Sequence, residues 1–352
     1  MNLKRYLNVC FVCLLLINIS CASPPARDEN EDVLAGSLNG EDTDHFEFIK
    51  SPLEEENLPV VSFNEIWAYV VSGKEQALKP GLPLSDIVYF GAEVDSYGHL
   101  ENIPLRKKLP AFRGSVHISI VCNSRGLTHF VIEPESAARK ILVDEILDAA
   151  KNYDGLNIDM ELVPERDSGN FLSFLAELHA GIGDKKIFSV CVPARTQPGG
   201  TYDYVKIASI SDKVFVMAYD EHWSTSKPGP IASMQWCKAV SDYALKTIGL
   251  KKLVMGIPFY GRSWGDSNPS RAIIHETTEK IKKEHGIEAI RRINGIPTFN
   301  YELTVKVQVY YEDEYSLATR AALYDRQGVR SIGFWRLGQE SNAAWSVLQL
   351  TK

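Results

Sequence analysis

From about Val60 to the end of the chain, short apolar segments alternate with longer segments that have helical periodicity. Strands that alternate with helices favour a parallel sheet, because each helix returns the chain to the start of the next strand. We predict eight such strands: Glu65–Val71, Asp86–Ala92, Ser115–Cys122, Gly155–Leu162, Ile187–Pro193, Lys213–Tyr219, Lys252–Pro258 and Ser331–Trp335. Eight is the number that a (β/α)8 barrel requires, so the expected fold is α/β, a TIM barrel.

The segments between these strands include amphipathic helices and one insertion. In Ser136–Tyr153, apolar residues spaced three and four apart predict a helix that packs outside the strands: Ala138, Ile141, Leu142, Ile146 and Ala149. At residues 265–325 a helix-like run, Arg271–His285, precedes Thr298–Tyr311, which alternates like antiparallel strands. This stretch is too long for a loop. It predicts a small α+β insertion between the seventh and eighth strands.

The N-terminus has the features of an export signal. Lys4 and Arg5 precede a mostly apolar run, Leu7–Ile19, that is too short to span a bilayer permanently. The sequence Asn18-Ile-Ser-Cys21 is similar to a bacterial lipobox, in which Cys21 carries the lipid; the alternative is a secretory signal cleaved near Ala22. We therefore expect residues 1–21 to be a signal peptide. The protein would be a cell-envelope lipoprotein, at the outer membrane or cell surface, or a secreted protein.

Acidic residues are concentrated in residues 22–57. This stretch contains eleven acidic residues but only two basic ones, Arg27 and Lys50, and its composition predicts a disordered acidic tether. The whole chain has 38 basic and 45 acidic residues; without the four basic and eleven acidic residues of positions 1–57, 34 of each remain. A neutral body, residues 58–352, lacks the basic surface that nucleic acid requires, so nucleic acid is excluded as a partner.

Cysteine and histidine give no sign of a metal or disulfide framework. Cys122, Cys191 and Cys237 each lie in an apolar stretch and are expected to be buried packing residues. The eight histidines show no metal-ligand spacing. We therefore expect neither a metal ion nor an organic cofactor.

The strand Gly155–Leu162 carries the strongest functional signal. Because side chains alternate along a strand, Asn157, Asp159 and Glu161 share one face and the apolar residues between them share the other. The polar face would point into the barrel, with Glu161 nearest the carboxyl end, where barrel enzymes place their catalytic groups. Proximity and burial are expected to raise the proton affinity of Glu161, which suits a general acid.

The sequence Asp154-Gly-Leu-Asn-Ile-Asp-Met-Glu161 resembles the DxxDxDxE signature of family-18 glycoside hydrolases, the chitinase family. Three further segments resemble motifs of this family and follow in its order: Met217-Ala-Tyr-Asp220, Gly256–Trp264 and Gly333–Gly338. The stretch Glu221–Ala232 is also similar to bacterial members that act on cell-wall or spore glycans.

The resemblance implies a substrate-assisted reaction that retains the anomeric configuration, in which the 2-acetamido oxygen of the substrate is the nucleophile. Glu161 matches the proton donor, and Asp159 matches the residue that orients the acetamide. Tyr219 would hydrogen-bond the acetamide carbonyl, and Asp220 would hold the distorted sugar. Trp335 matches the tryptophan beneath that sugar.

Other residues of these motifs have supporting roles in the expected site. Ser119 and Asp154 are expected to support the acidic row, and the substrate-binding candidates are Met217, Trp223, Tyr260 and Arg262, besides Trp335. Asn157 replaces the commoner aspartate; it can donate a hydrogen bond to Asp159 but cannot share a proton with it.

The expected protein is a monomeric glycosidase that cleaves β-linked N-acetylglucosamine-containing glycans such as chitin or chitooligosaccharides. One alternative keeps the reaction but changes the substrate to peptidoglycan or an N-glycan. The other is a non-catalytic chitin-binding lectin of the same fold, although such proteins typically lack the residue that matches Glu161.

Overall fold

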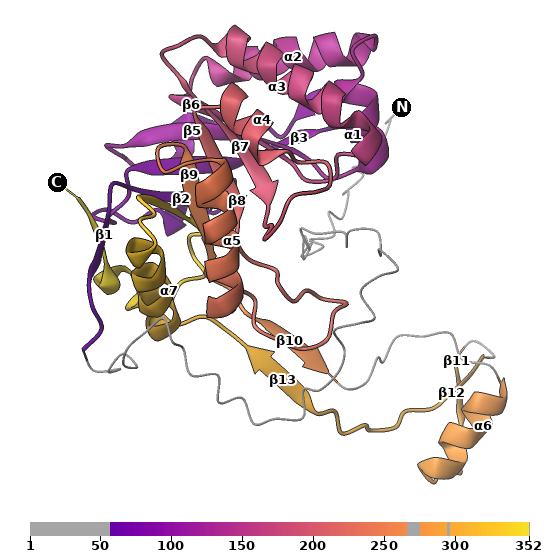
Figure 1. Ribbon diagram of the computed structural model, residues 1–352. Helices are drawn as coiled ribbons and strands as arrows, with labels where there is room; N and C mark the ends of the chain where they lie inside the picture. The colour runs from indigo at the N-terminus through magenta and orange to yellow at the C-terminus, as the bar shows by residue number, and fades with distance from the viewer. Residues whose placement is uncertain (1–56, 266–274, 294–295, 352) are drawn as a thin grey trace, which may run out of the picture.

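The structure is a computed structural model that describes residues 57–265, 275–293 and 296–351 (Figure 1). Eight parallel strands form its central ring: β2 (Glu65–Val71), β3 (Asp86–Val94), β5 (Ser115–Cys122), β6 (Gly155–Met160), β7 (Ile187–Pro193), β8 (Lys213–Met217), β9 (Leu253–Pro258) and β14 (Ser331–Trp335). The ring closes because β2 pairs with both β14 and β3. The predicted (β/α)8 barrel is confirmed, and β6 and β8 each end two residues earlier than expected.

Helices follow the strands and cover the outside of the ring (Figure 1). They are α1 (Arg125–Ile132), α2 (Ala137–Ala150), α3 (Ser168–Ile182), α4 (Tyr204–Ile210), α5 (Met234–Thr247) and α7 (Glu314–Arg326). Short 3-10 helices are η2 (Glu75–Ala77), η3 (Arg106–Lys108), η4 (Glu165–Asp167) and η5 (Ala344–Val347). Outward-facing apolar side chains of the strands pack against these helices and form the larger hydrophobic core.

The buried face of helix α2 can be compared with the predicted apolar stripe. Its N-cap is Ser136, whose side chain accepts a hydrogen bond from the Ala138 backbone N–H. Ala138, Leu142, Ile146 and Ala149 are buried as predicted, but Ile141 is 41% exposed and Val143 is buried in its place. One of the five predicted residues, Ile141, was therefore wrong. The buried face of the helix is slightly rotated from the predicted face, so that it includes Val143.

Inward-facing side chains fill the ring with a second hydrophobic cluster, which includes Trp67, Tyr69, Phe90, Phe215 and Met217. The Phe215 ring occupies the centre because Gly333 on β14 has no side chain: a Cβ at Gly333 would lie 2.3 Å from that ring. This packed interior leaves the chemistry to the ends of the barrel.

Polar groups occupy the amino end of the barrel. His117 is fully buried, and its Nε2 lies 2.9 Å from Asp86 Oδ1. Lys213 donates to Glu65 Oε1 at 2.5 Å and thereby joins β8 to β2 across the ring. These pairs close the end of the barrel that is remote from Glu161.

The segment between β9 and β14 differs in part from the predicted insertion. It contains β10 (Arg262–Gly265), α6 (His275–Glu284), β11 (Arg291–Ile293), β12 (Ile296–Thr298) and β13 (Val307–Tyr310). β10 pairs antiparallel with β13, and β11 pairs antiparallel with β12. Figure 1 shows α6, β11 and β12 lying apart from the barrel.

Two details of the predicted insertion were wrong. The segment between Thr298 and Val307 is not in a strand, so Thr298–Tyr311 is not continuous. Residues 314–325 were included in the insertion, yet they form most of helix α7, whose buried residues Leu317, Ala321 and Tyr324 belong to the barrel core. Helix α7 is therefore the helix that precedes the eighth barrel strand.

The first and last strands of the described chain lie together. β1 (Val61–Phe63) pairs in parallel with β15 (Leu348–Leu350), and the remaining strand, β4 (Leu100–Glu101), runs antiparallel to β3. The predicted signal peptide, its Cys21 and residues 22–56 of the predicted tether lie outside the described residues. None of the described helices is both long and apolar enough to cross a membrane.

Candidate active site

Strand β6 carries the predicted polar row toward its carboxyl end. Asn157 is fully buried and Asp159 is 4% exposed, and both point into the ring as the alternation predicted. Glu161 directly follows the last residue of β6 and is half-buried. The structure therefore places Glu161 at the mouth of the barrel, partly accessible to solvent.

Asn157 is held by hydrogen bonds from three other strands. Its Oδ1 accepts from Ser119 Oγ at 2.9 Å and from Tyr69 OH at 3.1 Å, and its Nδ2 donates to Ser189 Oγ at 2.9 Å and to Cys191 Sγ at 3.5 Å. Both amide hydrogens are thus used away from Asp159. The amide hydrogens of Asn157 bond to Ser189 and Cys191, and the amide cross-links the floor of the site.

Asp159 is a buried carboxyl group with unused bonding capacity. Within the described part of the chain, its Oδ1 has no hydrogen-bond partner. Burial, and then repulsion by Glu161, raise the pKa of Asp159, while a hydrogen bond with Cys191 opposes the shift. A buried oxygen without a partner costs free energy, so this atom is available to a ligand donor.

Tyrosines surround this pair of carboxyl groups. Burial raises the pKa of Tyr219, and the nearby Cys191 and Asp159 raise it further. The pKa of Tyr69 is raised by the same three causes, burial first, then Cys191 and then Asp159. Both hydroxyl groups therefore stay protonated at neutral pH and can donate hydrogen bonds within the site.

The sequence did not reveal three residues of this site. Tyr69 contacts Asn157, and Cys191 lies 2.9 Å from the Tyr69 hydroxyl. The hydroxyl of Tyr202 accepts from Val163 N at 3.3 Å and donates to Met160 O at 2.7 Å, so it braces the backbone on both sides of Glu161. The inward alternation of β2 and β7 could have indicated Tyr69 and Cys191; nothing in the sequence pointed to Tyr202.

Cys191 is both buried and part of the polar network. It is a free thiol, as are Cys122 and Cys237, and all three are buried as expected. Burial and the nearby Asp159 raise the pKa of Cys191. It is therefore a neutral hydrogen-bonding group and not only a packing residue.

A second polar group lies at the carboxyl ends of β8 and β9. Asp220 Oδ1 accepts from Tyr260 OH at 2.7 Å and from Arg262 Nη2 at 2.7 Å. The Arg262 guanidinium also lies over the Tyr260 ring, 5.5 Å from its centroid. Asp220 has φ of 59°, a left-handed conformation that aspartate tolerates better than most residues. The structure thus joins three predicted site residues in one cluster.

The predicted tryptophans occupy different positions. Trp335 is the last residue of β14 and packs against the Tyr69 and Phe90 rings, with centroid distances of 5.2 and 4.9 Å. Met217 belongs to the same interior cluster. Trp223 lies in the loop after β8, where its Nε1 donates to Thr225 Oγ1 at 2.9 Å. Trp335 therefore borders the acidic row, whereas Trp223 belongs to the rim.

The two predicted supporting residues act at opposite ends of β6. Ser119 contacts Asn157 directly. Asp154 precedes β6, is half-exposed, and accepts from Arg106 Nη2 at 2.7 Å and from Val116 N at 2.9 Å. Asp154 does not contact the acidic row, and it fixes the amino end of the strand instead.

The sequence profile of the glycosyl hydrolases of family 18 matches residues 97–340. The glycosylase YvbX of Bacillus subtilis (strain 168) is 32% identical over 226 residues, which cover 60% of this chain and 66% of YvbX. A cortical fragment-lytic enzyme of Bacillus anthracis is 25% identical over 241 residues, 64% of this chain and 56% of that enzyme. The chain thus spans between half and two thirds of these relatives.

The solved structures include the Bacillus cereus spore cortex-lytic enzyme SleL. It superposes with a TM-score of 0.65 at 21% identity, over 84% of this chain and 76% of SleL. This likeness supports the barrel fold independently of the strand pairing described above.

Proposed function

This chain belongs to glycosyl hydrolase family 18, and from that premise we propose that it cleaves β-linked N-acetylglucosamine-containing glycans with Glu161 as the proton donor. The observation that carries the proposal is the pair at the mouth of the barrel. Asp159 is buried with a free Oδ1, and Glu161 follows it two residues later at the carboxyl end of β6. Such a pair offers one group to orient the substrate and one to protonate it.

In this mechanism Glu161 gives its proton to the glycosidic oxygen as the C–O bond breaks. The carbonyl oxygen of the substrate's own acetamide bonds to the anomeric carbon on the opposite face, which forms an oxazolinium intermediate. Asp159 accepts a hydrogen bond from the acetamide N–H through its free oxygen, and the Tyr219 hydroxyl donates to the acetamide carbonyl. Glu161 then takes a proton from water as the water opens the intermediate, so the configuration is retained.

The remaining predicted residues form the surroundings of the sugar. Trp335 presents an indole plane beside Tyr69, which suits the apolar face of a pyranose. Asp220 is held by Tyr260 and Arg262 and offers its carboxylate to a hydroxyl of the distorted sugar. Asn157 keeps the floor rigid through its four hydrogen bonds.

A cell-wall or spore glycan is a second candidate substrate. A relative named cortical fragment-lytic enzyme supports such a glycan, and relatives named di-N-acetylchitobiase support chitin oligosaccharides. An N-glycan remains an alternative with the same chemistry.

The test is to incubate the purified protein with chitooligosaccharides, peptidoglycan and N-glycans and to identify products by mass. Glu161→Gln should lower kcat by at least about a hundredfold while leaving sugar binding intact, because it removes the transferable proton and little volume. Glu165→Gln is the matched control, since Glu165 is exposed and only four residues away, and it should keep the wild-type rate.

Two results would contradict the proposal. A Glu161→Gln protein with nearly wild-type turnover would exclude the proton-donor role. A wild-type protein that binds these sugars without cleaving any of them would instead indicate a lectin. Retention is tested separately by NMR, which should show the β-anomer as the first product, and substrates without the 2-acetamido group should not be cleaved.

The cellular location is also a proposal. We propose that the chain is exported and anchored through Cys21. Mass spectrometry of the membrane fraction should find a lipid on the Cys21 peptide, and Cys21→Ala should release the protein from membranes.

A further inference from the structure

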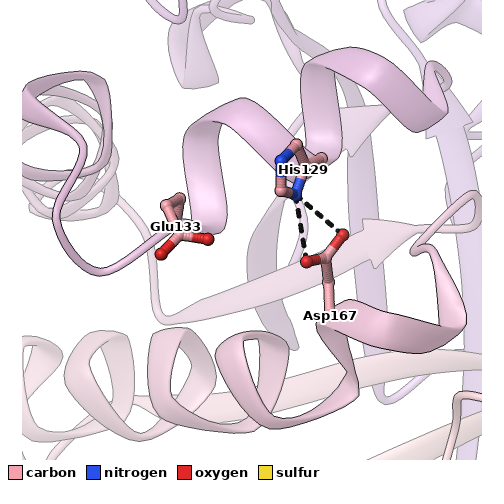
Figure 2. Close-up of side chains that lie close together, drawn as sticks. All are labelled: His129, Glu133 and Asp167. Carbon is pink, nitrogen blue, oxygen red and sulfur yellow. Dashed lines mark hydrogen bonds and ion pairs between the residues drawn. The ribbon is translucent and has the colours of Figure 1, made fainter.

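A cluster of potential metal ligands lies outside the barrel, between helices α1 and α3 (Figure 2). His129 lies in the last turn of α1, Glu133 directly follows that helix, and Asp167 ends η4 immediately before α3. One ligand atom from each side chain lies within 4.8 Å of the other two. We propose that these three residues bind a divalent transition-metal ion, with zinc as the best fit.

The chemistry of the donors selects this class of ion. One imidazole nitrogen and two carboxylate oxygens suit zinc and similar transition metals, whereas magnesium and calcium prefer oxygen ligands alone. Three protein ligands also leave room for a water molecule as the fourth. The cluster therefore resembles an open tetrahedral set more than a calcium cage.

The distances are compatible with a single bound ion. His129 Nδ1 lies 3.0 Å from both Asp167 oxygens. Ligands of a tetrahedral zinc ion at about 2.1 Å lie roughly 3.4 Å from one another, so an ion can take the place of the proton between these groups. Figure 2 shows the Glu133 carboxylate beside this pair. Glu133 is partly exposed, and one of its carboxylate oxygens lies within 4.8 Å of the ligand atoms of the other two.

The surroundings hold the two carboxylates in position. Asp167 is 3% exposed, and although it is the N-cap residue of α3 its side chain forms no capping hydrogen bond. Asn170 Nδ2 on α3 donates to Glu133 Oε2 at 3.0 Å, which is the kind of outer contact that orients metal ligands. The Arg166 Nε lies 3.8 Å from Asp167 Oδ2, but the Arg166 side chain is 72% exposed and free to turn away.

A bound ion would join two parts of the fold that are distant in sequence. It would link the end of α1 to the segment that leaves β6, on which Asp167 follows Glu161 by six residues. The ion would brace this segment from outside the barrel. This inference uses only the geometry of the cluster and does not depend on the proposed function.

The experiment is metal binding by the full-length, tag-free protein after treatment with EDTA. Equilibrium dialysis with zinc should give one ion per wild-type chain. Glu133→Gln and His129→Gln should each weaken zinc binding at least tenfold. Saturating zinc should raise the Tm of the wild type by roughly 3 °C. Glu165→Gln removes an exposed carboxylate from the same segment and should bind zinc as the wild type does.

Cobalt supplies a readout that reports on the ligands themselves. The visible absorption spectrum of Co²⁺ bound to the wild type should change in intensity when Glu133 or His129 is replaced. Glu133→Gln is the decisive variant, because Glu133 is partly exposed and its replacement leaves the His129–Asp167 pair intact. Absence of zinc uptake, or equal uptake by the wild type and by Glu133→Gln, would overturn the proposal.

Discussion

Asn157 and Asp159 are neighbours on one strand face, yet the protein uses them in opposite ways. Every hydrogen-bonding position of Asn157 is taken by residues of β2, β5 and β7. Asp159 keeps one oxygen unpartnered in a buried position. The amide therefore contributes rigidity, whereas the carboxylate retains an interaction that only a ligand can complete.

The burial of Asp159 should affect how the free energy of unfolding depends on pH. The pKa of Asp159 is raised in the folded protein, so its protonated form favours folding. This contribution to the free energy of unfolding is fully present below the ordinary pKa of aspartate. It is lost as the pH rises through the raised pKa. Asp159→Asn removes the buried charge. We expect its free energy of unfolding to exceed that of the wild type by a margin that grows between pH 4 and pH 7, as measured by urea denaturation.

Glu161→Gln provides the control for this measurement. Repulsion by Glu161 is the second cause of the raised pKa of Asp159. In a protein that carries Glu161→Gln, the stability gained by Asp159→Asn should therefore depend less on pH. A margin that stays constant over the whole pH range would show that Asp159 is not destabilised by its charge.

The inward row was predictable because alternation along one strand is a local property. Asn157, Asp159 and Glu161 could be assigned to one face from their spacing alone. The contacts of Asn157 with Tyr69 and Ser189 join residues 88 and 32 positions away, and they depend on strand register, which no local pattern gives. For this reason the sequence did not reveal the partners of Asn157.

Elements with strong periodicity were predicted well, and boundaries less so. The eight strands were found because buried parallel strands are short and apolar between polar turns. Most of helix α7 fell within the bounds of the predicted insertion, because a helix that follows an irregular segment carries no local sign of what it packs against. Its burial in the barrel core becomes visible only in three dimensions.

Helix α7 is fixed to the catalytic side by a buried ion pair. Arg320 is 1% exposed, its Nη1 and Nη2 each lie 2.9 Å from Glu312, and Nη2 also donates to Ala232 O at 2.8 Å. Glu312→Gln leaves the buried guanidinium without its counter-charge and should lower the free energy of unfolding by about 3 kcal/mol.

A surface pair between Asp325 on α7 and Arg330, which follows the helix, serves as the control. Asp325 and Arg330 are about half-exposed and 3.5 Å apart, so Asp325→Asn should cost less than about 1 kcal/mol. Both variants can be compared by chemical denaturation. Equal losses would mean that burial does not govern the strength of these pairs.

At the scale of the whole molecule, the segment outside the barrel exposes an alternating apolar face. Leu303, Val305, Val307, Val309 and Tyr311 are each at least 38% exposed. In the sequence this alternation predicted antiparallel strands. The structure pairs Val307 and Val309 with β10, so the antiparallel pairing is confirmed for this part of the segment, and it leaves both side chains exposed.

Replacing these valines should therefore cost little. Val307→Thr with Val309→Thr removes apolar surface that is already 58% exposed at each site, and it should change the free energy of unfolding by less than about 0.5 kcal/mol per site. Light scattering should show less aggregation on heating. Val214→Thr on β8, at a fully buried position, should by contrast cost about 1–3 kcal/mol. A large loss in the double variant would show that this face is covered.

The metal-binding cluster also could not be predicted from the sequence. His129 and Glu133 are four residues apart, at the end of α1 and directly after it, which is a weak sign by itself. The third ligand, Asp167, comes from another helix start, and only the packing of α1 against α3 brings it within reach.

The pairing of β1 with β15 has a consequence for how the protein meets its surroundings. β1 leads directly into the amino end of β2, so the chain enters and leaves the barrel at the closed end, opposite Glu161. Both ends of the described chain are therefore tied to the closed end by one strand pair. The open end, with Glu161, is left clear of them, so a long polymer can pass across it without meeting either end of the described chain.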